Sequence, residues 1–549
     1  MEKILDKIKR EPMTISQWML GFVGIFFIRY FFEALSSPTS SGIIPSDPYT
    51  LIHVGLFFLS VTLGTAFIIG FFSKDYVNTP KIILFALPVI WLAPIIDIIL
   101  SYGEGYKMTY LFDSHGKLLV DFFTFFGPIL NQGATYGIRI GIVLILIGVG
   151  WYLWQINKNA FKTILGVLSV YAFGFVMSII PGLIYTFSNI FSQAGAYAEV
   201  LSYFEKIIFQ STISHNTLRE GVSFVSRVRF FELGFDKLLS QMLFILSVFF
   251  GGLLFWKMDS KKFLAILKNC RLERIGSYIA ILLCGMGFAY INKLGSPFVW
   301  TDLLGIACLL LSWVSLWMYA VHINDITDVK IDAVSNSNRP LIQKEITLES
   351  MRETGYVWLT MALIGSWSVG YYPFFMSLVY VACSYIYSSM PLRLRRFPII
   401  PSFLIGVASL ATILAGFFFI SIYKQIQIFP PLLSAGIIIM VTLAINVKDM
   451  KDVEGDKADG ILTLPTLFGE MGAKIVGLCF ALSFLLVPIF LSFYILYIVA
   501  LPSAIVGYKL VTKKPYKENP IFILRFVFLF SIALFYLSGY WLAHIYNLL

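Results

Sequence analysis

Long apolar stretches separated by short polar segments run along the chain from Trp18 to Ala543. Crossing the ~30 Å hydrocarbon core of a bilayer takes about 20 helical residues, and the stretches reach that length about fifteen times. In the C-terminal half we expect nine spans, at residues 275–292, 298–323, 352–371, 373–390, 400–421, 429–447, 473–490, 492–511 and 521–546. In the N-terminal half we expect six, at residues 16–35, 51–73, 82–102, 135–155, 163–187 and 237–256. The pattern predicts an all-α, polytopic membrane protein.

A basic stretch at residues 257–274 divides the chain. Its cationic residues are Lys257, Lys261, Lys262, Lys268, Arg271 and Arg274. Polytopic domains of this kind need roughly 200–300 residues, so chain length and span count together favour two membrane domains. We therefore expect a six-span membrane domain of unknown function at 1–256 and a nine-span domain at 275–549. Residues 257–274 are expected to form a cytoplasmic linker along the lipid headgroups.

Composition supports a bilayer environment. Hydrophobic residues make up 58% of the 549 residues and charged residues 13%, against ~45–50% and ~25% in soluble domains. The net charge of +10 would also suit nucleic acid, but Lys and Arg gather in the loops after every second span of the C-terminal half. The positive-inside rule places those loops in the cytoplasm. We expect a multi-pass protein of the cell membrane with no nucleic-acid partner.

Two acidic motifs with one spacing lie at the ends of the second and sixth spans of the C-terminal half. They read Asn324-Asp325-Ile-Thr-Asp328-Val-Lys-Ile-Asp332 and Lys448-Asp449-Met-Lys-Asp452-Val-Glu-Gly-Asp456. On a continuous helix, the shared spacing Asp-x2-Asp-x3-Asp puts the three carboxylates of each motif on one face. An even number of crossings separates the two spans. Both motifs are therefore expected at the same membrane surface, where they can converge on one site.

Clustered carboxylates repel one another, and the repulsion grows near hydrocarbon, so such a cluster is expected to bind a cation. Oxygen ligands without His or Cys favour a hard ion, and Mg²⁺ in proteins is held by a few carboxylates together with substrate phosphates. The candidate metal ligands are Asp325, Asp328, Asp332, Asp449, Asp452 and Asp456. The candidate phosphate donors beside them are Arg339, Arg393, Arg395, Lys448 and Lys451. Any single acid here could equally be a solvated loop residue, and any single base a membrane anchor; the matched motifs are what favour a site.

The motifs resemble those of the UbiA superfamily of membrane prenyltransferases, whose pattern is NDxxDxxxD on the second of nine helices and DxxxD on the sixth. Three further segments are similar to the family pattern: Arg339-Pro340-Leu341, Tyr387-Ser388-Ser389-Met390-Pro391-Leu392-Arg393-Leu394-Arg395-Arg396, and Gly460-Ile461-Leu462-Thr463-Leu464-Pro465. The resemblance covers about residues 270–549 and implies a nine-helix UbiA-type bundle. The N-terminal half shows no comparable resemblance.

The resemblance implies a Mg²⁺-dependent enzyme that transfers a polyprenyl group from its diphosphate to an aromatic or lipid acceptor. It implies catalytic roles for Asp325, Asp328, Asp452 and Asp456. Asn324 then joins the diphosphate-binding residues. Tyr385, Tyr387 and Ser388 near the motifs are expected in the substrate pocket, where aromatic faces could stabilise an allylic cation, although each tyrosine could equally belong to an interfacial belt. The family's usual Pro-Ser-Gly after Arg-Pro-Leu is replaced here by Ile342-Gln343-Lys344, so the acceptor stays open.

Two other interpretations of the motifs stay open. A transporter would bind a translocated cation on the acidic faces, and a catalytically silent UbiA-like scaffold would keep the fold for lipid or isoprenoid binding. Basic residues beside the motifs suit an anion better than a cation pathway, and a silent site is free to lose costly acids. In the N-terminal half, Arg29 and Glu33 are one helical turn apart and are expected to pair. A docking module, a second enzyme and a transport domain are the hypotheses for that half.

Overall fold

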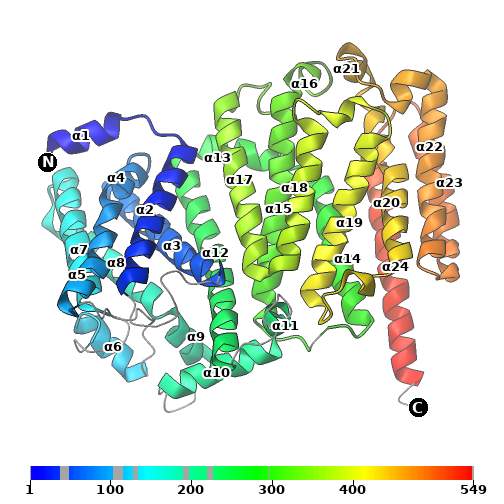
Figure 1. Cartoon of the computed structure of the whole chain (residues 1–549). Coiled ribbons are helices and arrows are strands. Elements are labelled where there is room, and N and C mark those ends of the chain that lie inside the picture. Colours follow the sequence, from blue (N-terminus) through cyan, green and yellow to red (C-terminus); the bar gives the residue numbers. More distant parts are fainter. Residues whose placement is uncertain are drawn as a thin grey trace. The chain divides into compact units, whose positions relative to one another are not determined.

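The computed structural model describes residues 2–36, 48–102, 110, 115–127, 134–188, 197–218, 227–295 and 297–546. Within these ranges every regular element is a helix, as Figure 1 shows. Contacts between Cα atoms divide the chain into two compact units. The first comprises Met1–Thr217, Val222–Phe263 and Val299–Gly305, and the second consists mainly of Leu264–Phe298 and Ile306–Leu549. The protein is therefore an all-α, polytopic membrane protein.

The first unit contains the six expected N-terminal spans, two of them as interrupted helices. Its helices are α1 (Glu2–Arg10), α2 (Ile15–Ser36), α3 (Pro48–Ser73), α4 (Thr79–Ala86), η1 (Leu87–Trp91), α5 (Leu92–Leu100), α6 (His115–Phe123), α7 (Tyr136–Asn157), α8 (Ala160–Ser178), α9 (Ile180–Ser188), α10 (Tyr197–Gln210), α11 (Thr212–Leu218) and α12 (Arg227–Met258). The span expected at 82–102 is broken by the 3-10 turn η1, because Pro88 has no N–H to continue the helix. The span expected at 163–187 is broken in the same way just before Pro181.

Arg29, Glu33 and Asp97, which lie within spans of the first unit, have protein partners. Arg29 forms an ion pair with Glu33, as the sequence predicts. The Asp97 carboxylate accepts hydrogen bonds from the Thr135 hydroxyl at 2.6 Å and from the Gly137 amide at 2.8 Å. These bonds satisfy donors at the start of α7, where the first N–H groups of a helix lack intrahelical partners. Asp97 thus acts as a helix cap between α5 and α7.

The second unit contains the nine expected C-terminal spans, apart from the first turn of α15 up to Gly305, which belongs to the first unit. They are α14 (Leu272–Ile291), α15 (Asp302–Thr327), α17 (Leu348–Val369), α18 (Tyr371–Ser388), α19 (Ile400–Ile420), α20 (Pro431–Ile445), α22 (Leu464–Phe490), α23 (Tyr497–Thr512) and α24 (Asn519–Tyr546). Shorter elements are α13 (Ser260–Lys268), α16 (Val329–Ser335), η2 (Leu394–Arg396), η3 (Ile426–Ile428), η4 (Asn446–Met450), α21 (Val453–Ala458) and η5 (Tyr494–Leu496). The basic stretch expected as a linker thus forms α13 and the start of α14.

Twelve spans in the described part of the chain are long and apolar enough to cross a membrane. The three other expected spans, α17, α18 and α24, are also helices. Of these, α17 begins with the charged residues Glu349, Arg352 and Glu353, and α18 is rich in tyrosine, which lowers the mean hydropathy of both.

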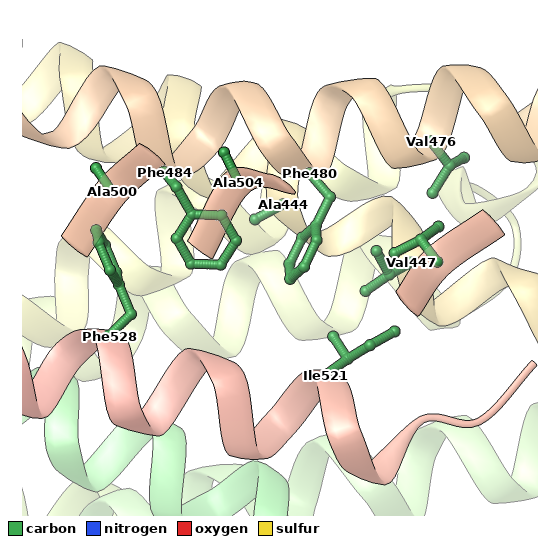
Figure 2. Packing of buried hydrophobic residues seen from close by; sticks show 10 residues of the cluster. Ala444, Val447, Val476, Phe480, Phe484, Ala500, Ala504, Ile521 and Phe528 are labelled. Carbon is green, nitrogen blue, oxygen red and sulfur yellow. The ribbon is translucent and has the colours of Figure 1, made fainter. Parts of the chain in front are cut away.

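Aromatic side chains from two helices form a buried cluster in the second unit (Figure 2). Phe480 and Phe484 of α22 meet edge to face with ring centroids 5.0 Å apart, and Phe528 of α24 meets Phe484 at 4.8 Å. Ala504 of α23 leaves room for these rings. Buried aromatic pairs with this geometry stabilise a core beyond their area alone. Val447 belongs to the same cluster, so the core holds the chain where the second acidic motif begins.

Two glycines let α14 and α19 approach closely. A Cβ added to Gly285 would lie 2.1 Å from the carbonyl oxygen of Ile413, and one added to Gly416 would lie 2.1 Å from that of Leu282. Small residues at such interfaces are how membrane helices bring their backbones together. Since α14 begins beside the acidic motifs, this packing fixes the position of residues that contact them.

Candidate active site

Each acidic motif is broken at its second aspartate. Helix α15 ends at Thr327 and α16 starts at Val329, with Asp328 between them at φ −100° and ψ 18°. In the second motif, Asp452 lies just before α21 at φ −100° and ψ 8°. The continuous helix expected for each motif is therefore wrong. Side-chain oxygens of Asp compete for local hydrogen bonds, and Asp favours helix ends over helix interiors.

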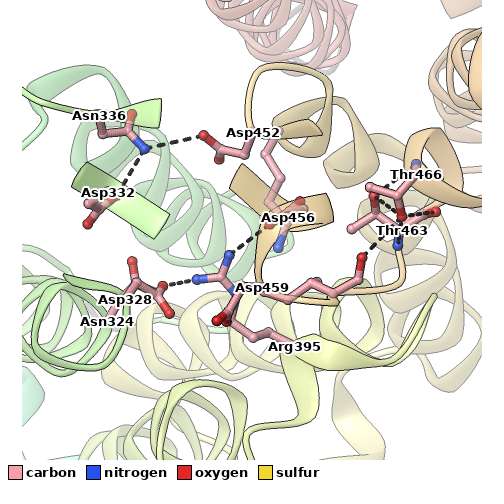
Figure 3. A network of polar contacts seen from close by, with 12 residues as sticks. Asn324, Asp328, Asp332, Asn336, Arg395, Asp452, Asp456, Asp459, Thr463 and Thr466 are labelled. Carbon is pink, nitrogen blue, oxygen red and sulfur yellow. Dashed lines mark hydrogen bonds and ion pairs between the residues drawn. The ribbon is translucent and has the colours of Figure 1, made fainter. Parts of the chain in front are cut away.

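The structure brings the two motifs together at one end of the second unit. Helices α16 and α21 contact each other there (Figure 1). The Asn336 side-chain amide donates to Asp332 at 2.9 Å and to Asp452 at 3.3 Å, so one residue bridges both motifs (Figure 3). Carboxylates separated by more than a hundred positions thus line one site.

Arginines from the segment between α18 and α19 form a second bridge. Arg395 forms an ion pair with Asp328 and donates to Asp456 at 3.4 Å (Figure 3). Arg393 donates to Asp328 at 3.0 Å and to Asp459 at 2.8 Å. The sequence singled out both arginines as phosphate donors. The structure places Arg395 between the two motifs and Arg393 between the first motif and Asp459.

The loop after α21 holds these arginines in position. Gly460 adopts φ +71°, a left-handed conformation that glycine takes without strain. The Ile461 amide then donates to the Asp456 carbonyl at 2.8 Å, and the Leu462 amide donates to the Arg396 carbonyl at 3.1 Å. Thr463 caps α22 by a reciprocal capping box with Thr466 (Figure 3). The Gly460–Pro465 segment therefore ties the arginine loop to the second motif.

Asp325 is bound by residues that the sequence assigned to the linker. The Asn269 amide donates to one of its carboxylate oxygens at 2.7 Å, and Arg271 donates to the other at 2.5 Å. The Trp317 indole donates to the Cys270 carbonyl at 2.6 Å and holds this segment against α15. No regular spacing links Asn269 and Arg271 to the motifs. The basic stretch at 257–274 was the only feature of the sequence that pointed to a role for this segment.

Burial is the main electrostatic influence on the acids. It raises the pKa of Asp332, and nearby Asp325 raises it further, while Arg339 at 4.0 Å lowers it. Burial also raises the pKa of Asp456 to about 7, against the opposing effect of Arg395. The protein's own cations thus leave part of the desolvation penalty of these carboxylates uncompensated, which favours binding of a further cation.

The remaining predicted residues lie around this site. Lys448 donates to the Tyr387 hydroxyl at 2.7 Å, with its ammonium 4.7 Å from the ring centroid. Asp449 is near enough to Lys448 for Coulombic attraction. Lys451 pairs with Glu518 at 3.1 Å, a residue that the sequence did not single out. Tyr385 is 48% exposed and does not line the cavity described next.

A cavity of about 180 Å³ opens beside the motifs within the second unit. Asn324, Tyr387, Ser388 and Lys448 line its polar part. The aromatic rings of Tyr278, Trp317 and Tyr380 also line it, with Tyr278 5.6 Å from Trp317 and 5.3 Å from Tyr380 between centroids. Further walls come from the aliphatic residues Leu404, Ile405, Ala408, Val441 and Ile445. The cavity therefore joins a charged end to a long apolar wall.

The donor set suits a hard divalent cation bound together with phosphate. No group of three or more metal-binding side chains converges on one point within the described ranges. Mg²⁺ usually keeps several waters and takes one or two carboxylates plus substrate phosphates, so it needs no such cage. Spare donors for phosphate are present: the Nε atoms of Arg271, Arg339 and Arg393 are buried without a hydrogen-bond partner in the described structure.

Comparison with known proteins finds similarity to one family in the C-terminal half. Residues 278–542 match the UbiA prenyltransferase family. The digeranylgeranylglyceryl phosphate synthase of Methanobrevibacter smithii is 30% identical over 166 residues, which are 28% of this chain and 56% of that protein. The Sulfolobus acidocaldarius synthase of the same name is 28% identical over 185 residues, 33% of this chain and 64% of that protein.

Chloroplastic chlorophyll synthase of Oryza sativa is 30% identical over 181 residues, which are 31% of this chain and 46% of that protein. The chain thus spans 46–64% of the length of these three curated relatives. Among solved structures, a UbiA homolog from Archaeoglobus fulgidus bound to GPP and Mg²⁺ is 17% identical. It covers 48% of this chain and 96% of its own, with a TM-score of 0.40.

Proposed function

Residues 278–542 belong to the UbiA prenyltransferase family, and from this premise we propose that the protein transfers a polyprenyl group from its diphosphate to an aromatic or lipid acceptor. The observation that carries the proposal is the bridging of the two acidic motifs by Asn336 and Arg395, next to a cavity that Asn324 and Lys448 of the same motifs line. Carboxylates for a metal, arginines for a diphosphate and a sheltered apolar wall meet at this one place. The names of the curated relatives also refer to synthases of prenylated products.

We assign the metal site to the carboxylates of the two motifs. Asp332, Asp452 and Asp456 are the most available carboxylates to hold Mg²⁺, and Asp449 lies next to them. Both oxygens of Asp325 and of Asp328 already accept hydrogen bonds or ion pairs, so Mg²⁺ at either carboxylate would have to displace one of these donors. When bound, Mg²⁺ would neutralise the negative charge that develops on the departing diphosphate.

The basic residues bind and orient the diphosphate in this proposal. Arg339, Arg393 and Arg395 lie against the acidic motifs, and Lys448 of η4 lines the cavity. Arginine matches phosphate oxygens with two parallel donors, so these side chains can hold the group in one orientation. Asn324 adds an uncharged donor at the same end of the cavity.

The cavity would shelter the allylic fragment from water. Breaking the bond between the prenyl C1 and the diphosphate oxygen leaves positive charge on the allylic carbons, and aromatic faces stabilise such charge. Tyr278, Trp317 and Tyr380 present rings to the cavity, and Tyr387 lies at its polar end. The aliphatic wall suits the remainder of the polyprenyl chain. The acceptor then forms the new bond to C1 and releases a proton.

The positive-inside bias supports a site that faces the cytoplasm in the cell membrane. Lys and Arg are concentrated in the loops at the end of the second unit that carries α16 and α21. A cation transporter fits the site less well, because arginines bind Asp325 and Asp328 directly and would oppose cation passage.

The direct test is incubation of the purified full-length protein with radiolabelled geranylgeranyl diphosphate, Mg²⁺ and a panel of aromatic and lipid acceptors. We expect a labelled, more hydrophobic product and stoichiometric diphosphate. A protein that neither cleaves the diphosphate nor transfers the label to any acceptor would argue for a silent scaffold.

A further inference from the structure

Helix α13 (Ser260–Lys268) has an exposed face that the candidate active site does not use. The helix has nine residues, too few to cross a bilayer, which takes about 20. It connects the end of one candidate span, Phe230–Met258, to the start of the next, Leu272–Ile291. The helix therefore lies at a membrane surface, at the depth of the lipid headgroups.

Leucines and lysines share this exposed side of α13. Lys261, Leu264 and Lys268 are spaced three and four positions apart, which puts them on one side of a helix. Leu267 lies beside them, three positions after Leu264. The two leucines are 52% and 46% exposed, and both lysines are exposed as well. We call these four residues the α13 face. Its composition is typical of a helix whose apolar side chains enter a bilayer while its ammonium groups stay among the headgroups.

The free charge near the α13 face is positive. Lys262 forms an ion pair with Asp259 at 3.8 Å. In contrast, neither Lys261 nor Lys268 takes part in an ion pair within the described part of the chain. Lys257, in the last turn of α12, is exposed too. A lysine close to an anionic lipid surface strengthens binding to it about 5-fold, so these side chains favour anionic over zwitterionic headgroups.

The chain passes directly from the α13 face to the first acidic motif. Lys268 is followed by Asn269, which is buried and donates to Asp325. Arg271, two positions further on, donates to the other oxygen of Asp325. The Asn269 backbone amide donates to the Ala265 carbonyl at 3.2 Å, so the last turn of α13 continues into this segment. A displacement of α13 therefore moves two donors that hold Asp325.

We propose that the α13 face binds anionic lipid headgroups and that this binding holds Asn269 and Arg271 on Asp325. Lys261 and Lys268 contact the lipid phosphates, while the leucines of the face enter the acyl region. A zwitterionic bilayer accepts the leucines but offers the lysines no net charge, so it holds α13 less firmly. Anionic lipid thereby raises the activity. This dependence of activity on lipid rests on the proposed prenyl transfer, whereas the lipid binding does not.

The test compares the full-length protein in nanodiscs of phosphatidylcholine alone and of phosphatidylcholine with about 30% phosphatidylglycerol as the anionic lipid. Amide hydrogen exchange of residues 260–271 measures how firmly α13 is held. We expect slower exchange of this segment in the anionic nanodiscs, and a smaller difference at high salt, which screens surface charge. Acceptor-free release of diphosphate from prenyl diphosphate should be at least about 5-fold faster in the anionic nanodiscs, the effect of one lysine near a charged surface.

Two double variants separate the α13 face from general surface charge. Lys261→Gln with Lys268→Gln should abolish both effects of the anionic lipid and leave the values in phosphatidylcholine unchanged. The matched control, Lys509→Gln with Lys513→Gln, removes two exposed lysines at the end of α23 and should respond to the anionic lipid as the wild type does. All four side chains are exposed, so thermal unfolding of both variants in detergent should match that of the wild type.

The outcomes distinguish this proposal from the proposed function. Equal exchange of residues 260–271 in the two lipids overturns the proposal, and so does an equal loss of the lipid effect in both double variants. Slower exchange with unchanged diphosphate release overturns the link from the α13 face to Asp325. The exchange measurement needs no catalysis. A wild type whose α13 responds to the anionic lipid but that cleaves no prenyl diphosphate in either nanodisc therefore supports the lipid binding and overturns the proposed function.

Discussion

The buried ion pair between Arg271 and Asp325 shows how one residue outside the motifs supports the site. The Asp325 side chain is 1% exposed and that of Arg271 14%. Burial lowers the pKa of Arg271 to about 10, with Asp325 opposing that shift, so the arginine stays charged near neutral pH. Removing one partner of a buried pair leaves the other uncompensated, whereas removing both together is much less harmful.

We therefore expect Arg271→Gln to lower the free energy of unfolding by about 3 kcal/mol. This value is at the lower end of the range for breaking a buried ion pair, because Asn269 still donates a hydrogen bond to Asp325. The double substitution Arg271→Gln with Asp325→Asn should recover most of this loss. Thermal unfolding in detergent measures both, with Arg352→Gln on the exposed face of α17 as the control. Equal destabilisation by the single and double variants would contradict a pairwise role.

At the residue scale, the sequence predicted the members of the two motifs from their repeated spacing and the arginines from their positions beside the motifs. It did not predict Asn269, Asn336 or Glu518. Each of these lies close to the site only through tertiary packing, and a single Asn or Glu carries no spacing signal. Tyr385 was expected in the substrate pocket as an aromatic residue near the motifs. It is 48% exposed, and residues two positions apart on a helix, such as Tyr385 and Tyr387, point in different directions.

At the element scale, the close approach of α14 and α19 makes a specific prediction. Gly285→Ala places a methyl group where the Ile413 carbonyl lies 2.1 Å away. The helices must separate, and overpacking of this kind destabilises by about 1–3 kcal/mol. Because α14 carries Arg274 and follows Arg271, prenyl diphosphate cleavage should also fall.

Gly287→Ala on the same helix is the matched control, since nothing lies within 4 Å of the added Cβ. Alanine has the higher helix propensity, by up to about 1 kcal/mol in exposed positions, so this variant should be as stable as the wild type or more so. Thermal unfolding of both purified variants measures the difference. Similar effects of the two substitutions would mean that the α14–α19 contact does not limit stability.

The sequence predicted the helical spans well, since hydrophobic length is a strong signal when a bilayer has to be crossed. The predictions from the sequence are wrong where a helix is interrupted. Pro88 and Pro181 break two spans of the first unit, and Asp328 and Asp452 break the two motifs. The motif breaks could not be read from spacing alone, because offsets of three and four residues also fit an unbroken helix.

At the scale of the whole molecule, the second unit holds every residue of the candidate site and of the cavity. The boundary at 257–274 remains a prediction, and so does the independence of the C-terminal half. We expect a protein that begins at Met258 to fold and to cleave prenyl diphosphate, since it keeps Asn269, Arg271 and all motif residues. If residues 1–256 deliver or position the acceptor, the truncated protein should show a higher KM for the acceptor and unchanged cleavage of prenyl diphosphate.

That truncated protein also loses α11, whose Thr212 donates from its amide and its hydroxyl to Asp302 at 2.9 and 2.8 Å. Asp302 keeps the Val299 amide at 2.9 Å as a partner. In the truncated protein, the Asp302 carboxylate lacks the two hydrogen bonds from Thr212. Asp302→Asn is therefore a useful companion variant, because it removes the negative charge of this carboxylate. A folded truncated protein that cannot cleave prenyl diphosphate, with or without this change, would show that the first half completes the active site.

Membrane orientation is a second prediction for the whole molecule. Val334 of α16 and Ala458 of α21 are exposed positions next to the two motifs. In a background without the five native cysteines, Val334→Cys and Ala458→Cys should react with a membrane-impermeant reagent only after the cells are opened. Labelling of either residue from outside intact cells would place the site on the opposite side of the membrane.

The most direct test of the central claim is acceptor-free release of diphosphate from prenyl diphosphate, with Mg²⁺ and with EDTA, by the wild type, Asp328→Asn and the exposed control Glu470→Gln. Glu470 is 84% exposed and pairs only with Lys514 in the described structure. We predict Mg²⁺-dependent release by the wild type and the control, and a loss of at least about 100-fold in Asp328→Asn, as for removal of a group that stabilises developing charge. Unimpaired release in EDTA, or by Asp328→Asn in Mg²⁺, would contradict the assignment of the two motifs as a magnesium and diphosphate site.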